Sequence, residues 1–411
     1  MVKRVLMIAF HYPPMQGSSG IQRSVKFANY LPRHGWEPMV LSAHPRAYPS
    51  TSADQVAEAG WVHRSFTLDA GRDLALGGRY PALLALPDRW SSWWLWAVPA
   101  ALALIRRHRP HVIWSTYPIA TAHLIGLTLH RLTGIPWVAD QRDPMTEPGY
   151  PVDARTRRIY RWIEARAMAR SSAMVCTTPG ALGAYRARFP KAGAERLWLI
   201  ENGFDEDSFR AAPAPSTAAP GARFTLVHSG LVYPSERDPS ALFAALASLA
   251  HAGSISGANL RVVLRATGHD DILRPLIARL GIGSMVELAP ALPYRAALAE
   301  MLAADGLLLL QGANCNAQIP AKLYEYLRAS RPILALTDPA GNSAAKLRSC
   351  GVDTIAPLDS APAISQALLR FVALARNGSA PIAPPAVVAA NSRAARTAEL
   401  AILLNRITES I

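Results

Sequence analysis

Short apolar runs alternate with longer segments in which apolar residues recur at helical spacing, and this pattern continues along most of the chain. In the first half, apolar runs predict buried strands at 5–10, 38–42, 112–115, 137–140 and 173–176. Segments with a helical period lie between most of them, at 21–34, 96–107, 120–132 and 160–169. In the second half, strands are predicted at 224–228, 261–266, 286–288, 306–310 and 333–336. Such alternation is typical of parallel sheets with helices on both faces.

A Pro- and Ala-rich segment near the midpoint, residues 211–220, separates the two sets of strands and helices. The 411 residues exceed what one ordinary core of roughly 150–200 residues needs. We therefore predict two doubly wound, Rossmann-like α/β domains facing a central cleft. The expected boundaries are 1–208 for the first domain, 209–222 for a linker and 223–385 for the second domain. Residues 386–411 read as a helix that belongs to the second domain or packs back on the first.

The net charge of +14 is carried almost entirely by arginine, since lysine occurs only at positions 3, 26, 191, 322 and 346. Nucleic acid, anionic lipid and phosphorylated small molecules are admissible partners for such a chain, and arginines spread over solvated faces are the alternative. No recognised nucleic-acid-binding module appears, so we expect no nucleic-acid partner.

Three scattered cysteines form neither a metal-ligand spacing nor an even disulfide framework, which indicates a reducing compartment. The apolar run at 5–10 is too short for a signal peptide, and no run reaches the roughly 18–20 apolar residues that span a bilayer. We expect a cytoplasmic protein, with contact at the inner face of the cytoplasmic membrane left open.

A Trp-rich segment at 90–109 precedes and includes an apolar helix with a basic end. Its tryptophans are Trp90, Trp93, Trp94 and Trp96, and its arginines are Arg106, Arg107 and Arg109. Trp and Arg together are typical of a helix in a membrane interface. The alternatives are a wall that binds sugar or lipid, and a helix whose tryptophans are part of the first core. A second basic group is formed by Arg155, Arg157, Arg158 and Arg161.

Two loops of the first domain could carry chemistry. Gly17-Ser18-Ser19-Gly20 joins the first strand to its helix, where backbone N–H groups can approach an anion, although a plain tight turn has the same composition. Arg142 and Asp143 follow directly after an apolar strand, at the sheet edge where α/β proteins place their sites. Charged residues there are costly to bury unless they are paired or used. The alternative is an Arg142–Asp143 ion pair that pins the loop.

In the second domain, Gly230 and Gly268 each follow a predicted strand, and Arg237 opens a predicted helix, where a guanidinium suits a diphosphate. Lys322 and Glu325 are three residues apart on one face of another helix. A carboxylate such as Glu325 can accept both ribose hydroxyls of a nucleotide. The alternative is an ion pair with Lys322, worth a few tenths of a kcal/mol.

Several motifs occur in a recognisable order. They are a Pro-Pro and glycine loop after the first strand, TYP at 116–118, VADQRDP at 138–144, ENGFD at 201–205, HSGLVYPSERDP at 228–239, RATG at 265–268 and IPAKLYEYL at 319–327. The order and spacing resemble the retaining glycosyltransferases of GT-B fold, group 1 or family 4. The resemblance runs almost end to end and implies an acceptor-binding first domain and a second domain that binds a nucleotide sugar.

By this resemblance, Glu325 binds the donor ribose, Arg237 and Lys322 lie near its diphosphate, and no metal or other cofactor is expected. The glycine loop at 17–20 would lie beneath the phosphates, and Arg142 or Asp143 would contact the acceptor or the transferred sugar. Two positions depart from the family pattern. Ala317 stands where the first glutamate of a two-glutamate motif is usual, and Arg142 where a histidine is common.

We therefore predict an enzyme that moves a sugar from a nucleoside diphosphate sugar to a glycan or lipid-linked acceptor, with retention of configuration. The expected setting is bacterial surface-polysaccharide or glycolipid biosynthesis. Two alternatives remain open from the sequence: a nucleotide-sugar epimerase of the same fold, and a non-catalytic module that binds nucleotide sugars or membranes.

Overall fold

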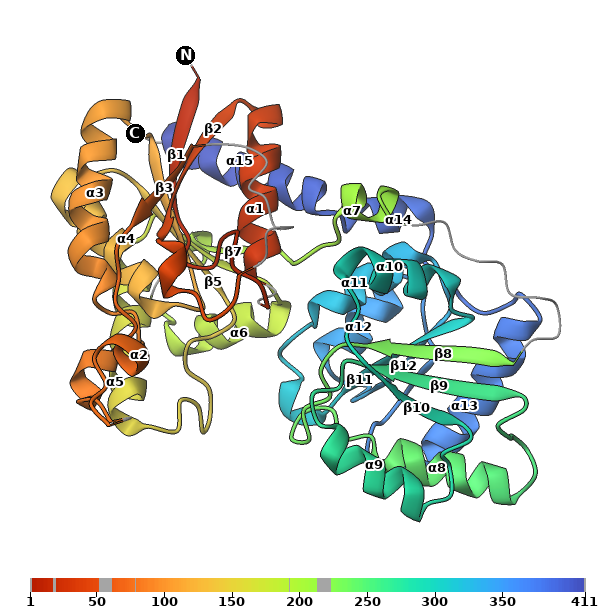
Figure 1. The fold of residues 1–411 in the computed structure, drawn as a ribbon. Helices are drawn as coiled ribbons and strands as arrows, with labels where there is room; N and C mark the ends of the chain where they lie inside the picture. The colour runs from red at the N-terminus through yellow and green to blue at the C-terminus, as the bar shows by residue number, and fades with distance from the viewer. Residues whose placement is uncertain are drawn as a thin grey trace. The chain divides into compact units, whose positions relative to one another are not determined.

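The computed structural model describes residues 2–17, 20–51, 61–77, 79–191, 193–212 and 223–409. The chain forms two compact units (Figure 1). Unit 1 comprises Met1–Asn202 together with Arg393–Ile411, and unit 2 comprises Gly203–Ser392. The division falls at Asn202, whereas the sequence places the end of the first domain at 208. The predicted linker lies largely outside the described residues.

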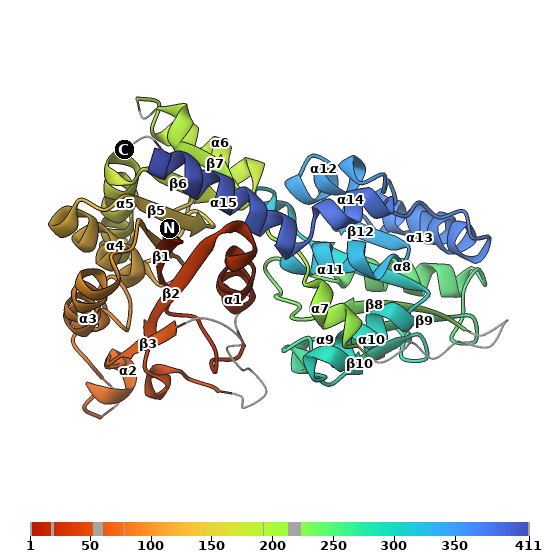
Figure 2. The same ribbon diagram turned by 90° about the horizontal axis from the view of Figure 1, so that it is seen from above.

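Unit 1 is built on a parallel sheet of seven strands in the order β3-β2-β1-β4-β5-β6-β7. The strands are β1 (Lys3–Ile8), β2 (Trp36–Ala43), β3 (Trp61–Ser65), β4 (Val112–Thr116), β5 (Trp137–Arg142), β6 (Ala173–Cys176) and β7 (Leu197–Leu199). The helices are α1 (Gly20–Tyr30), α2 (Ala70–Asp73), α3 (Trp93–His108), α4 (Ala120–Thr133), α5 (Ala154–Arg170), α6 (Pro179–Arg188) and α15 (Arg393–Glu409). Helices α3, α4 and α5 lie along one face of the sheet, and α1 and α15 along the other (Figure 2).

Unit 2 contains a parallel sheet of six strands in the order β10-β9-β8-β11-β12-β13. The strands are β8 (Phe224–Ser229), β9 (Leu260–Arg265), β10 (Val286–Ala289), β11 (Gly306–Gln311), β12 (Ile333–Thr337) and β13 (Ile355–Ala356). The helices are α7 (Glu206–Arg210), α8 (Ser240–His251), α9 (Asp270–Arg279), α10 (Tyr294–Ala303), α11 (Ala321–Ala329), α12 (Asn342–Ser349), α13 (Ala361–Arg376) and α14 (Pro385–Ala390).

Alternate residues of the central strands of unit 2 face two separate cores. Leu308 and Leu310 of β11 pack with α8 and α13, whereas Leu307 and Leu309 pack with α10 and α11. A strand with helices on both faces therefore reads as the unbroken apolar run that the sequence shows at 306–310. The strand order reverses between β8 and β11, and a reversal of this kind marks the usual ligand site of an open α/β sheet.

Helix α7 belongs to unit 2 because its first residue is tied to α11. Both carboxylate oxygens of Glu206 accept hydrogen bonds from Arg328, at 2.5 and 2.7 Å. Asp205 caps the helix by accepting from the Ser208 backbone N–H at 3.0 Å. The contact between Glu206 and Arg328 thus holds α7 to unit 2, which begins at Gly203.

The predicted fold class is confirmed, with two doubly wound parallel sheets. Every strand predicted from an apolar run is present. Three strands were not predicted, namely β3, β7 and β13. Within the described ranges, no helix is both long and apolar enough to cross a membrane.

Candidate functional site

Lys322, near the start of α11, is held by a histidine at the end of β8. Its Nζ lies 3.1 Å from Nε2 of His228, and Nδ1 of His228 lies 2.9 Å from the Leu308 carbonyl oxygen. A carbonyl only accepts, so Nδ1 carries the ring proton and Nε2 accepts from the lysine. A line of hydrogen bonds thus runs from the backbone of β11 through a fully buried imidazole to the amino group.

The surroundings of Lys322 disfavour its positive charge. Burial, and then the nearby charge of Arg237, lower the pKa of Lys322 from 10.5 to about 7, while the carboxylate of Glu325 acts in the opposite direction. Burial also holds the pKa of His228 well below its usual value, so this ring is neutral. A lysine poised between its two charge states is suited to an anionic ligand, which would restore the ammonium form.

Two glycines shape the loops near this amino group, one beside Nζ of Lys322 and one against Leu231. Gly230 has φ +110°, and a Cβ there would lie 3.1 Å from Nζ of Lys322. Gly268 has φ +74°, and a Cβ there would lie 2.7 Å from a methyl group of Leu231. Both positions therefore require glycine, because of the backbone conformation and the close neighbours.

Arg237 lies on the loop between β8 and α8, three residues before the helix. Its Nη1 donates to the Leu231 carbonyl at 2.8 Å, and its guanidinium stacks over the ring of Tyr233 at 5.3 Å. The loop after β8 thus folds so that Arg237 is close enough to influence the charge of Lys322. Two cations next to a glycine loop at the sheet reversal are suited to a diphosphate.

Glu325 lies almost one turn after Lys322 on α11 and is held from α10. The Tyr294 hydroxyl donates to its Oε1 at 2.8 Å. The carboxylate of Glu325 also acts on the charge of Lys322, so the pairing of these two residues within the helix stays a prediction. Sequence reasoning missed Tyr294, and it did not assign a role to His228, although a titratable residue at the end of an apolar strand is a signal.

In unit 1, Gly17 has φ +83° and Gly20 begins α1. Ser18 and Ser19 lie outside the described residues, so the predicted phosphate loop stays a prediction.

Arg142 is the last residue of β5, and Asp143 begins the loop after it. Asp140, at the end of the same strand, is fully buried and binds Arg23 through both oxygens, at 2.8 and 3.0 Å. Thr116 adds a third hydrogen bond to Asp140 at 2.8 Å. The alternative of an ion pair between Arg142 and Asp143 is not found among the described residues, and Arg23–Asp140 is the pair that stabilises the strand end.

The tryptophans of the 90–109 segment divide between core and surface. Trp93 is fully buried and donates from Nε1 to Ser65 at 2.7 Å, and Trp90 packs partly buried against the same core. Trp94 and Trp96 are 37% and 39% exposed, next to Leu95 at 58%. The core interpretation is thus right for Trp93, whereas Trp94, Leu95 and Trp96 are each partly exposed in the first turn of α3, with Trp94 against Thr128 and Trp96 against Phe66.

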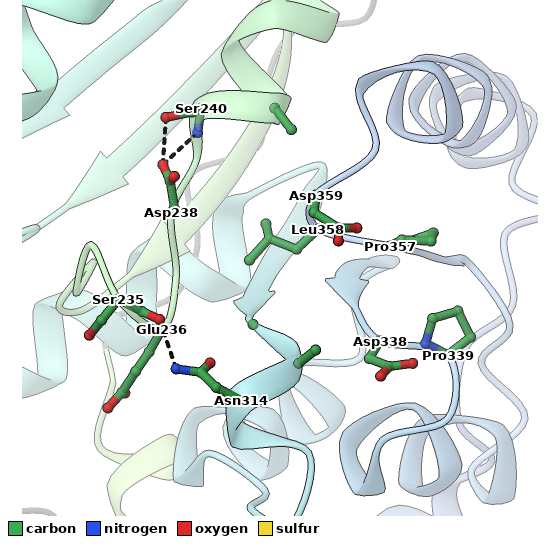
Figure 3. A pocket seen from close by; sticks show the side chains of 13 residues that line it. Ser235, Glu236, Asp238, Ser240, Asn314, Asp338, Pro339, Pro357, Leu358 and Asp359 are labelled. Carbon is green, nitrogen blue, oxygen red and sulfur yellow. Dashed lines mark hydrogen bonds between the residues drawn. The ribbon is translucent and has the colours of Figure 1, made fainter. Parts of the chain in front are cut away.

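A cavity of about 640 Å³ opens in unit 2 among the loops after β8, β11, β12 and β13. It is lined by residues that include Glu236, Asp238, Asp338 and Asp359, and no lysine or arginine of the described chain is among them. Figure 3 shows Asp238 hydrogen-bonded to Ser240, with Asp338 and Asp359 across the cavity. A space lined by carboxylates repels a diphosphate, and it shares no residue with the group formed by Arg237, Lys322 and Glu325.

Comparison with known proteins finds one matching family model and many similar solved structures. Residues 20–203 match the family model of the glycosyl transferase 4-like domain. A sucrose-phosphate synthase from Thermosynechococcus elongatus is similar over 100% of both chains, with 15% identity and a TM-score of 0.66. HepE from Anabaena, solved with UDP, is 14% identical with a TM-score of 0.65, over 98% of this chain and 100% of that one.

The same fold occurs in a candidate UDP-N-acetylglucosamine 2-epimerase from Listeria monocytogenes, with 11% identity and a TM-score of 0.62 over 100% of this chain and 98% of that one. A search of curated proteins finds no match. The predicted resemblance is confirmed: the chain has the GT-B fold of glycosyltransferases. The part of the chain that matches the glycosyl transferase 4-like model, residues 20–203, makes up most of unit 1.

Proposed function

We propose that this protein transfers a sugar from a nucleoside diphosphate sugar to an acceptor, and that unit 2 binds the donor. One observation carries the proposal: Lys322, whose pKa is lowered to about 7, adjoins Gly230 at the sheet reversal of unit 2, with Arg237 nearby and Glu325 on the same helix. The solved complex of HepE with UDP supports a nucleotide in this fold.

In this proposal, Lys322 and Arg237 bind the diphosphate and stabilise the negative charge that grows on the leaving nucleotide. Glu325, oriented by Tyr294, accepts the ribose hydroxyls, while Gly230 and Gly268 allow the donor to approach the backbone. No metal is required, because the two cations neutralise the leaving group. Arg142 or Asp143 of unit 1 contacts the acceptor or the transferred sugar, and transfer retains the anomeric configuration.

We further propose a role in the assembly of a bacterial surface polysaccharide or glycolipid. The exposure of Trp94, Leu95 and Trp96 supports contact with a lipid-linked acceptor at a membrane, since indole rings favour the interface. The arginines at the other end of α3 are suited to anionic headgroups.

Thermal unfolding with UDP, GDP, ADP and dTDP tests donor binding. A nucleotide at a hundred times its Kd adds about 2.7 kcal/mol, which raises Tm by several degrees. We expect Glu325→Ala and Lys322→Gln to abolish that shift. Asp359→Asn, which removes an exposed carboxylate from the acidic cavity, is the matched control and should leave it unchanged.

Transfer from labelled nucleotide sugars then tests the reaction. Absence of any nucleotide-induced shift refutes the donor site. Interconversion of nucleotide sugars without transfer would establish the epimerase instead, and binding without either reaction would establish a non-catalytic module.

A further inference from the structure

Arg142 has an unusual backbone conformation for an arginine. Its φ of +58° is left-handed, and the pairing of β5 with β6 shifts register between Asp140 and Arg142. This conformation costs a non-glycine residue about 1–2 kcal/mol. It is held by Thr177, whose backbone N–H and hydroxyl donate to the Arg142 carbonyl at 3.2 and 3.0 Å. Strain that the surroundings enforce in this way gathers at ligand-binding positions.

The side chain of Arg142 is poorly satisfied for a buried cation. It is only 9% exposed, and Nη1 donates to the Tyr117 carbonyl at a long 3.4 Å. Its buried Nε has no hydrogen-bond partner, and no ion pair of the described residues includes it. An uncompensated buried charge costs several kcal/mol, so an arginine kept here needs an anion that the chain itself does not supply.

The buried carboxylates nearest in sequence are already engaged. Asp140 is neutralised by Arg23. Glu164 is also fully buried, pairs with Arg188 at 2.6 Å and accepts from the Met145 backbone N–H at 2.9 Å. On the other side, burial and the charge of Arg142 lower the pKa of His11 to about 4, so His11 is neutral at pH 7. Asp143, the partly exposed carboxylate next in sequence, forms no ion pair with Arg142, so none of the carboxylates of the described residues pairs with this guanidinium.

The segment that follows Arg142 is fixed before any ligand arrives. Glu164 of α5 accepts from the backbone N–H of Thr146 at 3.2 Å and from its hydroxyl at 2.6 Å. Tyr185 of α6 donates to the same carboxylate at 2.7 Å. With Thr177 at one end and Glu164 at the other, the segment 142–146 loses little further freedom when a ligand binds.

We propose that Arg142 is the anion-binding residue of unit 1 and that it binds a carboxylate or phosphate group of a sugar substrate. A guanidinium grips either group with two parallel hydrogen bonds, and its two Nη groups are a suitable pair of donors, because Nε is buried. The substrate assignment rests on the proposed sugar transfer, whereas anion binding at Arg142 does not.

Arg142→Asn separates a ligand-binding role from a structural one. Asparagine tolerates the left-handed conformation and carries no charge, so we expect the unliganded variant to have a Tm equal to or above that of the wild type. Glucuronate and glucose 6-phosphate are the probes, and glucose is the neutral control. Binding of whichever anion the wild type prefers should weaken at least tenfold in Arg142→Asn and remain in Arg158→Gln, which removes an exposed arginine from α5.

Arg142→Lys adds a second readout. Lysine keeps the positive charge but lacks the two parallel donors of a guanidinium, so this variant should retain part of the affinity for the anion. If Arg142→Asn instead lowers Tm by several degrees, or if anion binding is unchanged in it, the proposal is wrong. Glucuronate and glucose 6-phosphate show whether the site takes a carboxylate or a phosphate, and transfer from UDP-glucuronate against UDP-glucose shows whether donor or acceptor carries it.

The two proposals fail separately. If no nucleotide shifts the Tm but anions bind through Arg142, the proposed function is refuted and the anion site at Arg142 is supported. If UDP binds through Lys322 but anionic sugars bind equally with and without Arg142, the proposed function is supported and the anion site at Arg142 is refuted.

Discussion

A single buried amino group connects the pH of the solution to the proposed donor site. The pKa of Lys322 is about 7 in the unliganded protein, and a diphosphate favours the ammonium form. Nucleotide binding above pH 7 must therefore take up a proton, so affinity should fall with rising pH, by up to tenfold per unit. Calorimetry with UDP at pH 7 and 8.5, in buffers with different ionisation enthalpies, measures both quantities.

Lys322→Arg is the control for this linkage, because a guanidinium stays charged over the whole range. Its affinity for UDP should be nearly independent of pH, and it should take up no proton. Equal affinities of the wild type at pH 7 and 8.5 would refute the linkage. In the unliganded protein, the lowered pKa of Lys322 makes the free energy of unfolding rise with pH between about pH 7 and 10. In this range the unfolded chain still holds the proton that folded Lys322 has lost.

At the level of elements, a buried ion pair fastens α1 to the end of β5. Arg23 and Asp140 are 2% and 0% exposed, and Arg23 also donates to the carbonyls of Ile200 and Glu201, both at 3.0 Å. Arg23→Met would leave the carboxylate buried without compensation, which typically costs 3–5 kcal/mol. We expect a clear fall in the urea midpoint of unit 1.

A double-mutant cycle checks that this loss comes from the pair. Replacing both partners, as Arg23→Met with Asp140→Leu, removes the uncompensated charge together with its partner. The double variant should therefore be more stable than the sum of the two single losses indicates. Simple additivity would show that the two residues act independently.

Some strands could be predicted from the sequence and others could not. Long apolar runs such as 306–310 predict strands because both faces are covered. By contrast, β13 has two residues and β7 has three, too few for any period, and β3 contains His63 and Arg64.

The site divides in a similar way. Lys322 and Glu325 could be predicted because their relation is local to one helix. The contact of Lys322 with His228 joins residues 94 positions apart, and the left-handed φ of Arg142 depends on Thr177. Neither is visible in a periodic pattern.

In the whole molecule, unit 1 is discontinuous in sequence and unit 2 is not. Helix α15 closes unit 1: Leu400, Leu403 and Leu404 are buried in its core, and Asn405 accepts from Lys3 at 3.0 Å. Burying each leucine is worth about 1.5–3 kcal/mol, in a fold whose total stability is about 5–15 kcal/mol. A chain that ends at 392 should therefore lose the folding of unit 1.

Unit 2, by contrast, is one continuous segment with its own two cores, and it contains Arg237, Lys322 and Glu325. The segment 203–392 should fold alone and bind UDP with a Kd within a few-fold of the full chain. Its circular dichroism and calorimetric titration provide the measurement, and the same segment with Glu325→Ala is the control. If it folds but does not bind UDP while the full chain does, groups from unit 1 are needed for the donor, and Arg237, Lys322 and Glu325 are only part of the site.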